Sequence, residues 1–163
     1  MKDKANIYIE TSIVSYLSAR PSSNLTAAAW QQITFEWWET RRHYYDLYIS
    51  ELVITEAGRG NSDAARKRLS YLTDISRIII TDEARSLANT ILSQKILPEK
   101  AAADALHIAI ASYHDIDYLL TWNCTHINNA ATKPIIRKIC AEEGFTCPEI
   151  CTPQELMGDY KNG

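Results

Sequence analysis

Short apolar runs alternate along this chain with longer stretches in which apolar residues recur at helical spacing. The short runs are rich in β-branched and aromatic residues, and they predict strands at 6–9, 47–49, 78–80, 118–120 and 149–150. The third run, Ile78-Ile79-Ile80, is entirely apolar, which is typical of a strand that is covered on both faces.

The stretches between these runs carry helix-start and helix-stop signals. Helices are expected from 11 to 17, from 24 to about 42, from 50 to 58, from 63 to 71, after 81, from 99 to 114 and from 134 to 143. Hydroxyl or amide side chains cap several of them in this prediction: Thr11, Ser12, Asn24, Ser50 and Thr81. Strands and helices that alternate in this way indicate an α/β layer fold with a mainly parallel sheet.

The chain has 163 residues, which is the size of one domain, and we expect a single domain over 1–163. No apolar run is long enough to span a bilayer and no signal segment precedes the first strand, so we expect a soluble cytoplasmic protein with no membrane partner. The 17 basic and 20 acidic residues give a net charge of −3, which argues against a protein that coats nucleic acid by bulk electrostatics. A nuclease with a local acidic metal site remains compatible with this balance.

Reactive polar groups follow several of the predicted strands. In open parallel sheets, ligands bind beyond the carboxyl ends of the strands, near a switch in strand order. Glu10 directly follows the first strand, Asn123 follows the fourth, and Glu56 lies about two turns into the helix after the second. Asp104 lies in the most apolar helix, where a charge is either paired, metal-bound or on an exposed stripe. Periodicity alone does not choose between Glu51 and Glu56.

Four short motifs in these segments resemble those of the PIN-domain ribonucleases. Residues 7–12 resemble the opening motif of that family, in which an acid and a hydroxyl pair follow the first strand. Ser50 followed by Glu56 matches the second motif, 103–109 looks like the third, and 119–123 looks like the fourth. The similarity runs in order from Ile7 to Ile150, and it is greatest to the VapC-type toxins of bacterial toxin–antitoxin pairs.

The resemblance implies a three-layer α/β/α PIN-like fold with four to five strands in a mainly parallel sheet. It also implies a hydrolase, an endoribonuclease that uses Mg²⁺ or Mn²⁺ to cleave single-stranded or structured RNA. The implied metal-binding and catalytic residues are Glu10, Glu56, Asp104 and Asn123. In this interpretation Glu10 and Asp104 hold the principal ion, Glu56 orients a metal-bound water and Asn123 completes the outer shell. Hard divalent cations prefer such oxygen ligands and can activate water near neutral pH.

Two of these positions depart from the family pattern. Glu10 stands where the family usually has Asp, and Asn123 stands where it more often has an acid. Asn123 keeps an oxygen ligand but removes a negative charge, which should weaken a second metal site more than a first. A catalytically impaired PIN-like module that binds RNA or protein is therefore the alternative.

Several neighbouring residues have both a functional and a purely structural interpretation. Thr11, Ser12 and Thr121 would orient the ligands or touch a substrate phosphate, although hydroxyls at these positions also serve as helix caps. Arg59 begins a basic group, with Arg66, Lys67 and Arg68, that would contact RNA phosphates or form a solvated face. His107 shares a helical face with Asp104, and we interpret it as a packed structural histidine. The alternatives are a residue that supports a metal ligand and a proton donor to the leaving oxygen.

The helix expected from Asn24 carries aromatic residues on two faces. Trp30, Ile33 and Trp37 form one stripe at helical spacing and are predicted core. Phe35 and Trp38 point away from that stripe, and exposed aromatics are enriched at interfaces, so we expect a partner surface there. The expected partners are a cognate antitoxin, a second copy of this chain in a homodimer, and the RNA substrate.

Two other enzyme classes on similar sheets fit the sequence less well. Phosphatases and phosphotransferases of this type usually carry a nucleophilic Asp directly after a strand, whereas Glu10 stands here and no D-x-D follows. Nucleotide binding is disfavoured because the sequence contains neither a G-x-x-x-x-G-K nor a G-x-G-x-x-G stretch.

Overall fold

The computed structural model describes residues 3–158, and its centre is one parallel sheet of five strands in the order β3-β2-β1-β4-β5. The strands are β1 (Asn6–Ile9), β2 (Asp46–Ile49), β3 (Ser76–Arg77), β4 (Tyr118–Leu120) and β5 (Glu149–Cys151). Ile7 pairs with Leu47 on one side and with Tyr118 on the other. The chain runs outward from β1 to β3 and then crosses back to β4, so the strand order reverses between β1 and β4.

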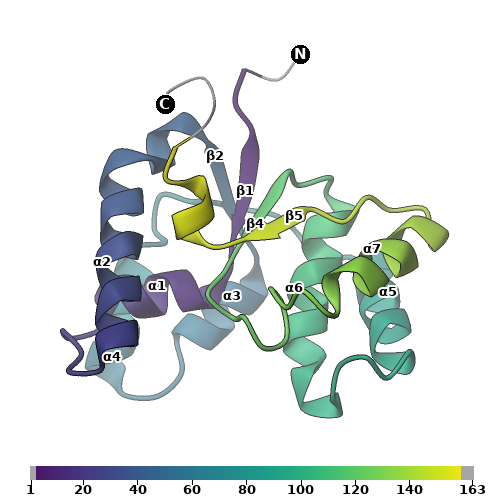
Figure 1. Cartoon of the computed structure of the whole chain (residues 1–163), viewed down its shortest axis with the longest axis horizontal. Helices are drawn as coiled ribbons and strands as arrows, with labels where there is room; N and C mark the ends of the chain where they lie inside the picture. Colours follow the sequence, from purple (N-terminus) through teal and green to yellow (C-terminus); the bar gives the residue numbers. More distant parts are fainter. Residues whose placement is uncertain (1–2, 159–163) are drawn as a thin grey trace.

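Helices cover both faces of this sheet. Those before β3 are α1 (Thr11–Ser18), α2 (Leu25–Thr40), α3 (Glu51–Ala57) and α4 (Ser62–Ser70). Those after it are α5 (Asp82–Ser93), α6 (Ala102–Tyr113) and α7 (Lys133–Glu142), and the short 3₁₀ turns are η1 (Arg42–Tyr44), η2 (Glu99–Ala101) and η3 (Pro153–Leu156). Figure 1 shows the two helix groups on opposite sides of the strands. Right-handed crossovers give this result when the direction of strand addition reverses.

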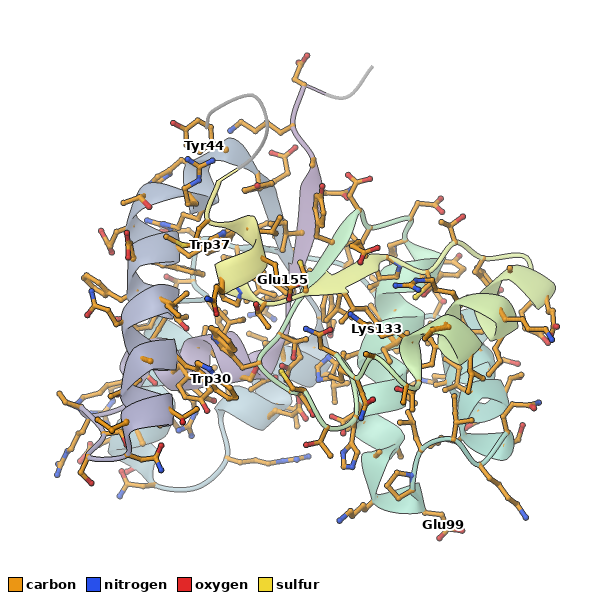
Figure 2. All side chains as sticks on the ribbon, in the orientation of Figure 1. Trp30, Trp37, Tyr44, Glu99, Lys133 and Glu155 are labelled. Atoms are coloured by element: carbon orange, nitrogen blue, oxygen red, sulfur yellow. The ribbon has the colours of Figure 1, made fainter. Side chains whose placement is uncertain are left out.

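The core forms where the two helix layers meet the central strands. Ile7, Tyr8 and Ile9 are fully buried, because β1 has a strand on each side and helices on each face. Figure 2 shows Trp30 and Trp37 on the inner side of α2. Trp37 is fully buried and its indole N–H donates to the Leu156 carbonyl at 3.1 Å, which ties α2 to η3. No helix among residues 3–158 combines the length and apolar character that a membrane crossing requires.

The predicted α/β fold with a parallel sheet of four to five strands is confirmed, but the third strand lies earlier than predicted. β3 covers only Ser76–Arg77, and Ile79 in the apolar run is 71% exposed. The prediction of a strand covered on both faces is wrong here, because the apolar run lies beyond the end of β3 and both residues of this edge strand are exposed. Ile78 still donates its backbone N–H to the Ile49 carbonyl at 2.8 Å.

The helix caps are only partly as predicted. Asn24 and Thr81 cap α2 and α5 through their side chains. In contrast, α1 is capped by the Glu10 carboxylate, and the Ser50 side chain makes no capping bond to α3. The hydroxyls near α1 and α3 are therefore directed to other partners.

The predicted pair of exposed aromatics on α2 is also only partly present. Phe35 is 53% exposed, as expected. Trp38 is only 3% exposed, because the Tyr71 ring packs edge-on against it at 5.9 Å and the Arg42 guanidinium lies 4.9 Å from its ring centroid. The expectation that Trp38 belongs to an exposed partner surface is therefore wrong for this chain.

Candidate metal centre

Glu10 lies at the point where the strand order reverses. Its backbone N–H donates to the Leu120 carbonyl at 3.1 Å, which extends the β1–β4 pairing, and its side chain is largely buried. The carboxylate accepts hydrogen bonds from the Ser12 backbone N–H at 3.2 Å, the Ser12 hydroxyl at 2.5 Å and the Thr121 hydroxyl at 2.6 Å. A buried carboxylate needs such donors to offset its lost hydration. These bonds fix the position of the Glu10 side chain between β1 and β4.

The same two hydroxyls also hold the chain that follows β4. Ser12 Oγ accepts from the Trp122 backbone N–H at 2.8 Å, and Thr121 Oγ1 accepts from the Asn123 backbone N–H at 2.9 Å. Ser12 and Thr121 are thus bonded to protein groups on both sides. Of the two sequence interpretations, orientation of Glu10 fits these contacts better than direct binding of a phosphate.

Glu56 reaches the site from the last turn of α3. Its Oε1 atom accepts from the Thr11 hydroxyl at 2.6 Å and lies 2.6 Å from His107 Nε2. Burial by itself would raise the pKa of Glu56, but the hydrogen bond and charge of His107, the Thr11 bond and the Arg59 charge together hold it below its ordinary value. Glu51, which periodicity alone could not exclude, is exposed and pairs with Arg77 instead.

His107 is fully buried, and both of its ring nitrogens have partners. Nε2 faces Glu56, while Nδ1 lies 2.7 Å from the Tyr8 hydroxyl. The Tyr8 oxygen in turn lies 2.8 Å from Ser50 Oγ. Burial, more than any charge, raises the pKa of Tyr8, so its hydroxyl stays protonated. His107 is buried, as the sequence interpretation expected, and it also contacts a site carboxylate, in line with the alternative role of supporting a ligand.

Glu10, Glu56 and His107 form a compact group. Each offers one ligand atom, and these atoms all lie within 4.8 Å of one another. Two ligands of a small divalent ion, each about 2.1 Å from it, lie about 3 to 4 Å apart. To surround one ion, the three groups would need small shifts, in which Glu56 Oε1 and His107 Nε2, now 2.6 Å apart, move away from each other. The carboxylate and imidazole donors suit such an ion chemically.

Asp104 and Asn123 form a second group beside the first. Asp104 lies one helical turn before His107 on α6, and its Oδ2 is 3.0 Å from His126 Nδ1. Asn123 Oδ1 accepts the backbone N–H of His126 at 3.0 Å. Asp104 is outside the compact group that Glu10 forms with Glu56 and His107. A direct metal-binding role for Asp104 and Asn123 stays a prediction.

The basic residues after Glu56 are less available than the sequence suggests. Arg68 donates through Nε to the Ala57 carbonyl at 2.8 Å and through Nη2 to the Arg59 carbonyl at 2.5 Å, which satisfies the end of α3. Arg59 itself is exposed. Lys67 and Arg20 line a cavity of about 440 Å³ between the end of α1 and the start of α4.

The sequence indicates that Tyr8 needs a buried hydrogen-bond partner, although it does not identify that partner. Tyr8 stands in a strand whose other central residues are Ile7 and Ile9, so its hydroxyl had to find a buried partner. No sequence pattern indicated that this partner is His107, because the two residues are 99 positions apart.

Comparison with known proteins finds the same architecture among solved structures. No protein-family model matches the sequence, and no curated protein sequence matches it. One similar structure is VapBC2 from Rickettsia felis bound to a DNA fragment from its promoter, with a TM-score of 0.57, 15% identity, and coverage of 90% of this chain and 98% of that one. Another is VapC20 of Mycobacterium tuberculosis, a sarcin–ricin loop cleaving toxin, with a TM-score of 0.58, 16% identity, and coverage of 74% and 92%. The chain therefore has the PIN-like α/β/α fold of the VapC toxins.

Proposed function

We propose that this chain is a metal-dependent endoribonuclease and the toxin of a VapBC-type toxin–antitoxin pair. The observation that carries the proposal is the meeting of Glu10 and Glu56 at the reversal of strand order, within one group of potential ligand atoms. Open parallel sheets bind their ligands at this place. The fold shared with VapC toxins supports the same function.

The charge and the position of the two glutamates suit the binding of a cation. Glu56 is ionised at neutral pH, because its pKa is held below the ordinary value. Its hydrogen bonds to Thr11 and His107 both fall on Oε1, so among the described residues Oε2 is left free for a ligand. Glu10 is held by Ser12 and Thr121. A bound Mg²⁺ or Mn²⁺ would supply charge neutralisation at the scissile phosphate and a more acidic water.

Asp104 and Asn123 keep their predicted places in the proposed site. The Asp104 carboxylate is 18% exposed and is bonded to His126 through one oxygen. It would bind the ion through water or after a small rotation toward Glu10. Asn123 lies two residues after Thr121, whose hydroxyl accepts its backbone N–H at 2.9 Å.

RNA is the substrate class that the surroundings of this site favour. Arg59 is exposed three residues after Glu56, and its charge is felt by that carboxylate. Arg20 and Lys67 line the cavity at the far end of α1, whose first turn contacts Glu10. Cations at such positions contact phosphates without reading sequence. A structured RNA loop, as in the description of VapC20, is the substrate to try first.

We further propose that an antitoxin covers the exposed part of α2 and that the toxin forms a homodimer. Phe35 is the half-exposed aromatic of this surface, and it lines a cavity of about 350 Å³ together with Tyr16 and Leu17. Leu25, at the start of the same helix, is 88% exposed. Apolar side chains in such a groove suit the apolar face of a partner segment.

The test is cleavage of a mixed RNA pool, including a structured ribosomal-type loop, by the purified chain with Mg²⁺ or Mn²⁺. Cleavage should be abolished by EDTA, and it should fall strongly in E10Q, E56Q and D104A. E51Q is the matched control, because Glu51 is an exposed acid on the same helix as Glu56. If the wild-type chain binds RNA but does not cleave it with either ion, the impaired binding module becomes the better description.

A further inference from the structure

His107 sits in a hydrogen-bonded chain that can run in either direction. A neutral imidazole has one nitrogen that donates and one that accepts. Tyr8 and Ser50 each carry a hydroxyl, which can donate or accept. All three side chains are fully buried, so they exchange these roles only with one another and with Glu56.

In the first direction, His107 carries its proton on Nε2 and donates to Glu56. Nδ1 then accepts from the Tyr8 hydroxyl, and the Tyr8 oxygen accepts from Ser50. In the second direction, Nδ1 carries the proton and donates to the Tyr8 oxygen, and Tyr8 donates to Ser50. Nε2 then presents a lone pair toward the space shared with Glu10 and Glu56.

The second direction is the arrangement of a histidine that binds a metal. A metal-bound histidine almost always donates its other ring N–H to a fixed partner, which sets the tautomer and the ring orientation. Tyr8 is such a partner, held in place by its burial in β1 and by Ser50. In the first direction the Nε2 proton is bonded to Glu56, whereas in the second direction Nε2 lacks a hydrogen-bond partner among the described residues and needs an ion instead. The first direction therefore suits the metal-free protein and the second suits the metal-bound one.

We infer that His107 is a nitrogen ligand of the metal ion, with Glu10 and Glu56, and that the centre therefore selects Mn²⁺ or another first-row transition ion over Mg²⁺. The inference rests on the proposed metal dependence but not on RNA cleavage. Mg²⁺ strongly prefers oxygen ligands, whereas imidazole suits transition ions. Binding switches His107 from the Nε2–H to the Nδ1–H tautomer and reverses the Tyr8–Ser50 chain.

Nuclear magnetic resonance of the ¹⁵N-labelled full chain tests the switch without any substitution. The free protein should show His107 protonated on Nε2, and saturation with diamagnetic Zn²⁺ should move the proton to Nδ1. An unchanged tautomer at saturating Zn²⁺ would overturn the inference. His114, whose Nε2 lies 2.7 Å from the Ile79 carbonyl and contacts no proposed ligand, should keep its tautomer and serves as the internal reference.

Pulsed electron paramagnetic resonance of the Mn²⁺-loaded chain gives a second readout. A ¹⁴N coupling is expected in the wild type and in H126Q, and it should vanish in H107Q. Because H107Q can fail to fold, Y8F is measured as well: it keeps the ligand but loses its support, and its Mn²⁺ affinity should fall about 10- to 100-fold by calorimetry. Absence of the coupling in the wild type, or equal affinities for Mn²⁺ and Mg²⁺, would contradict nitrogen ligation. If nitrogen ligation is contradicted but RNA cleavage persists with Mg²⁺, the proposed function still stands. If the chain binds no divalent ion, both the inference and the proposed function fail.

Discussion

The Tyr8 hydroxyl provides the sharpest test of how the site is built. It is the single link between Ser50 and His107, and all three residues are fully buried. Tyr8→Phe keeps the ring and its volume but removes this oxygen. Ser50 and His107 each then lose a partner in a place that water does not reach. Each buried polar group left without a bond costs about 1–3 kcal/mol.

We therefore expect Tyr8→Phe to lower the free energy of unfolding by about 2 to 4 kcal/mol. For a domain of this length that corresponds to a fall in Tm of roughly 5 to 15 °C. Urea unfolding followed by tryptophan fluorescence gives the free energy directly, because Trp37 and Trp122 lie in the core. The measurement is made without added metal, so that a change in ion binding does not enter.

Two further variants decide whether the hydrogen bonds are the cause. Tyr16→Phe is the matched control, because the Tyr16 hydroxyl makes no hydrogen bond within residues 3–158, and it should change stability by less than about 0.5 kcal/mol. The double variant Tyr8→Phe, Ser50→Ala should lose less than the sum of the single losses, since removing both partners leaves fewer unmade bonds. A Tyr8→Phe protein within about 0.5 kcal/mol of the wild type would refute the reasoning.

Three other outcomes follow from the contacts of the structure. Arg68→Ala should lower the free energy of unfolding by about 1 to 3 kcal/mol in urea, because it removes two bonds to carbonyls at the end of α3, whereas Lys67→Ala should be close to neutral. Trp122→Phe should cost about 2 to 3 kcal/mol in the same assay, since it removes the 2.7 Å bond to buried Thr34 and part of an aromatic stack. Because the pKa of Glu56 is lowered in the folded state, its ionisation contributes stability that is complete above the ordinary value of 4.5 and is lost as the pH falls through the folded value. Unfolding of the wild type and Glu56→Gln across pH 3 to 7 should show their difference shrinking below pH 4.5, and a difference that instead widens there would contradict the assigned direction.

Local signals were sufficient for most of the fold. The apolar runs at β1, β2, β4 and β5 read correctly as strands, because each is short, apolar and bounded by polar residues. The prediction of a covered strand at 78–80 was wrong, since an apolar sequence does not show whether a strand lies at the centre or the edge of a sheet. The prediction that Trp38 is exposed was wrong for a related reason. Helical periodicity gives the face on which a residue lies, but it does not show what covers that face.

The sequence by itself determined that polar groups would gather at the carboxyl ends of β1 and β4, because parallel strands and short crossovers leave few other arrangements. The position of Glu10 directly after the first strand singled it out, whereas Glu56 was selected over Glu51 only by the resemblance to the PIN-domain motifs. Only the tertiary structure decided that Glu56 rather than Glu51 faces the site, and that His107 joins them while Asp104 pairs with His126. These choices depend on side-chain distances of a few ångströms between segments far apart in the chain, and residue spacing along one polypeptide does not carry that information.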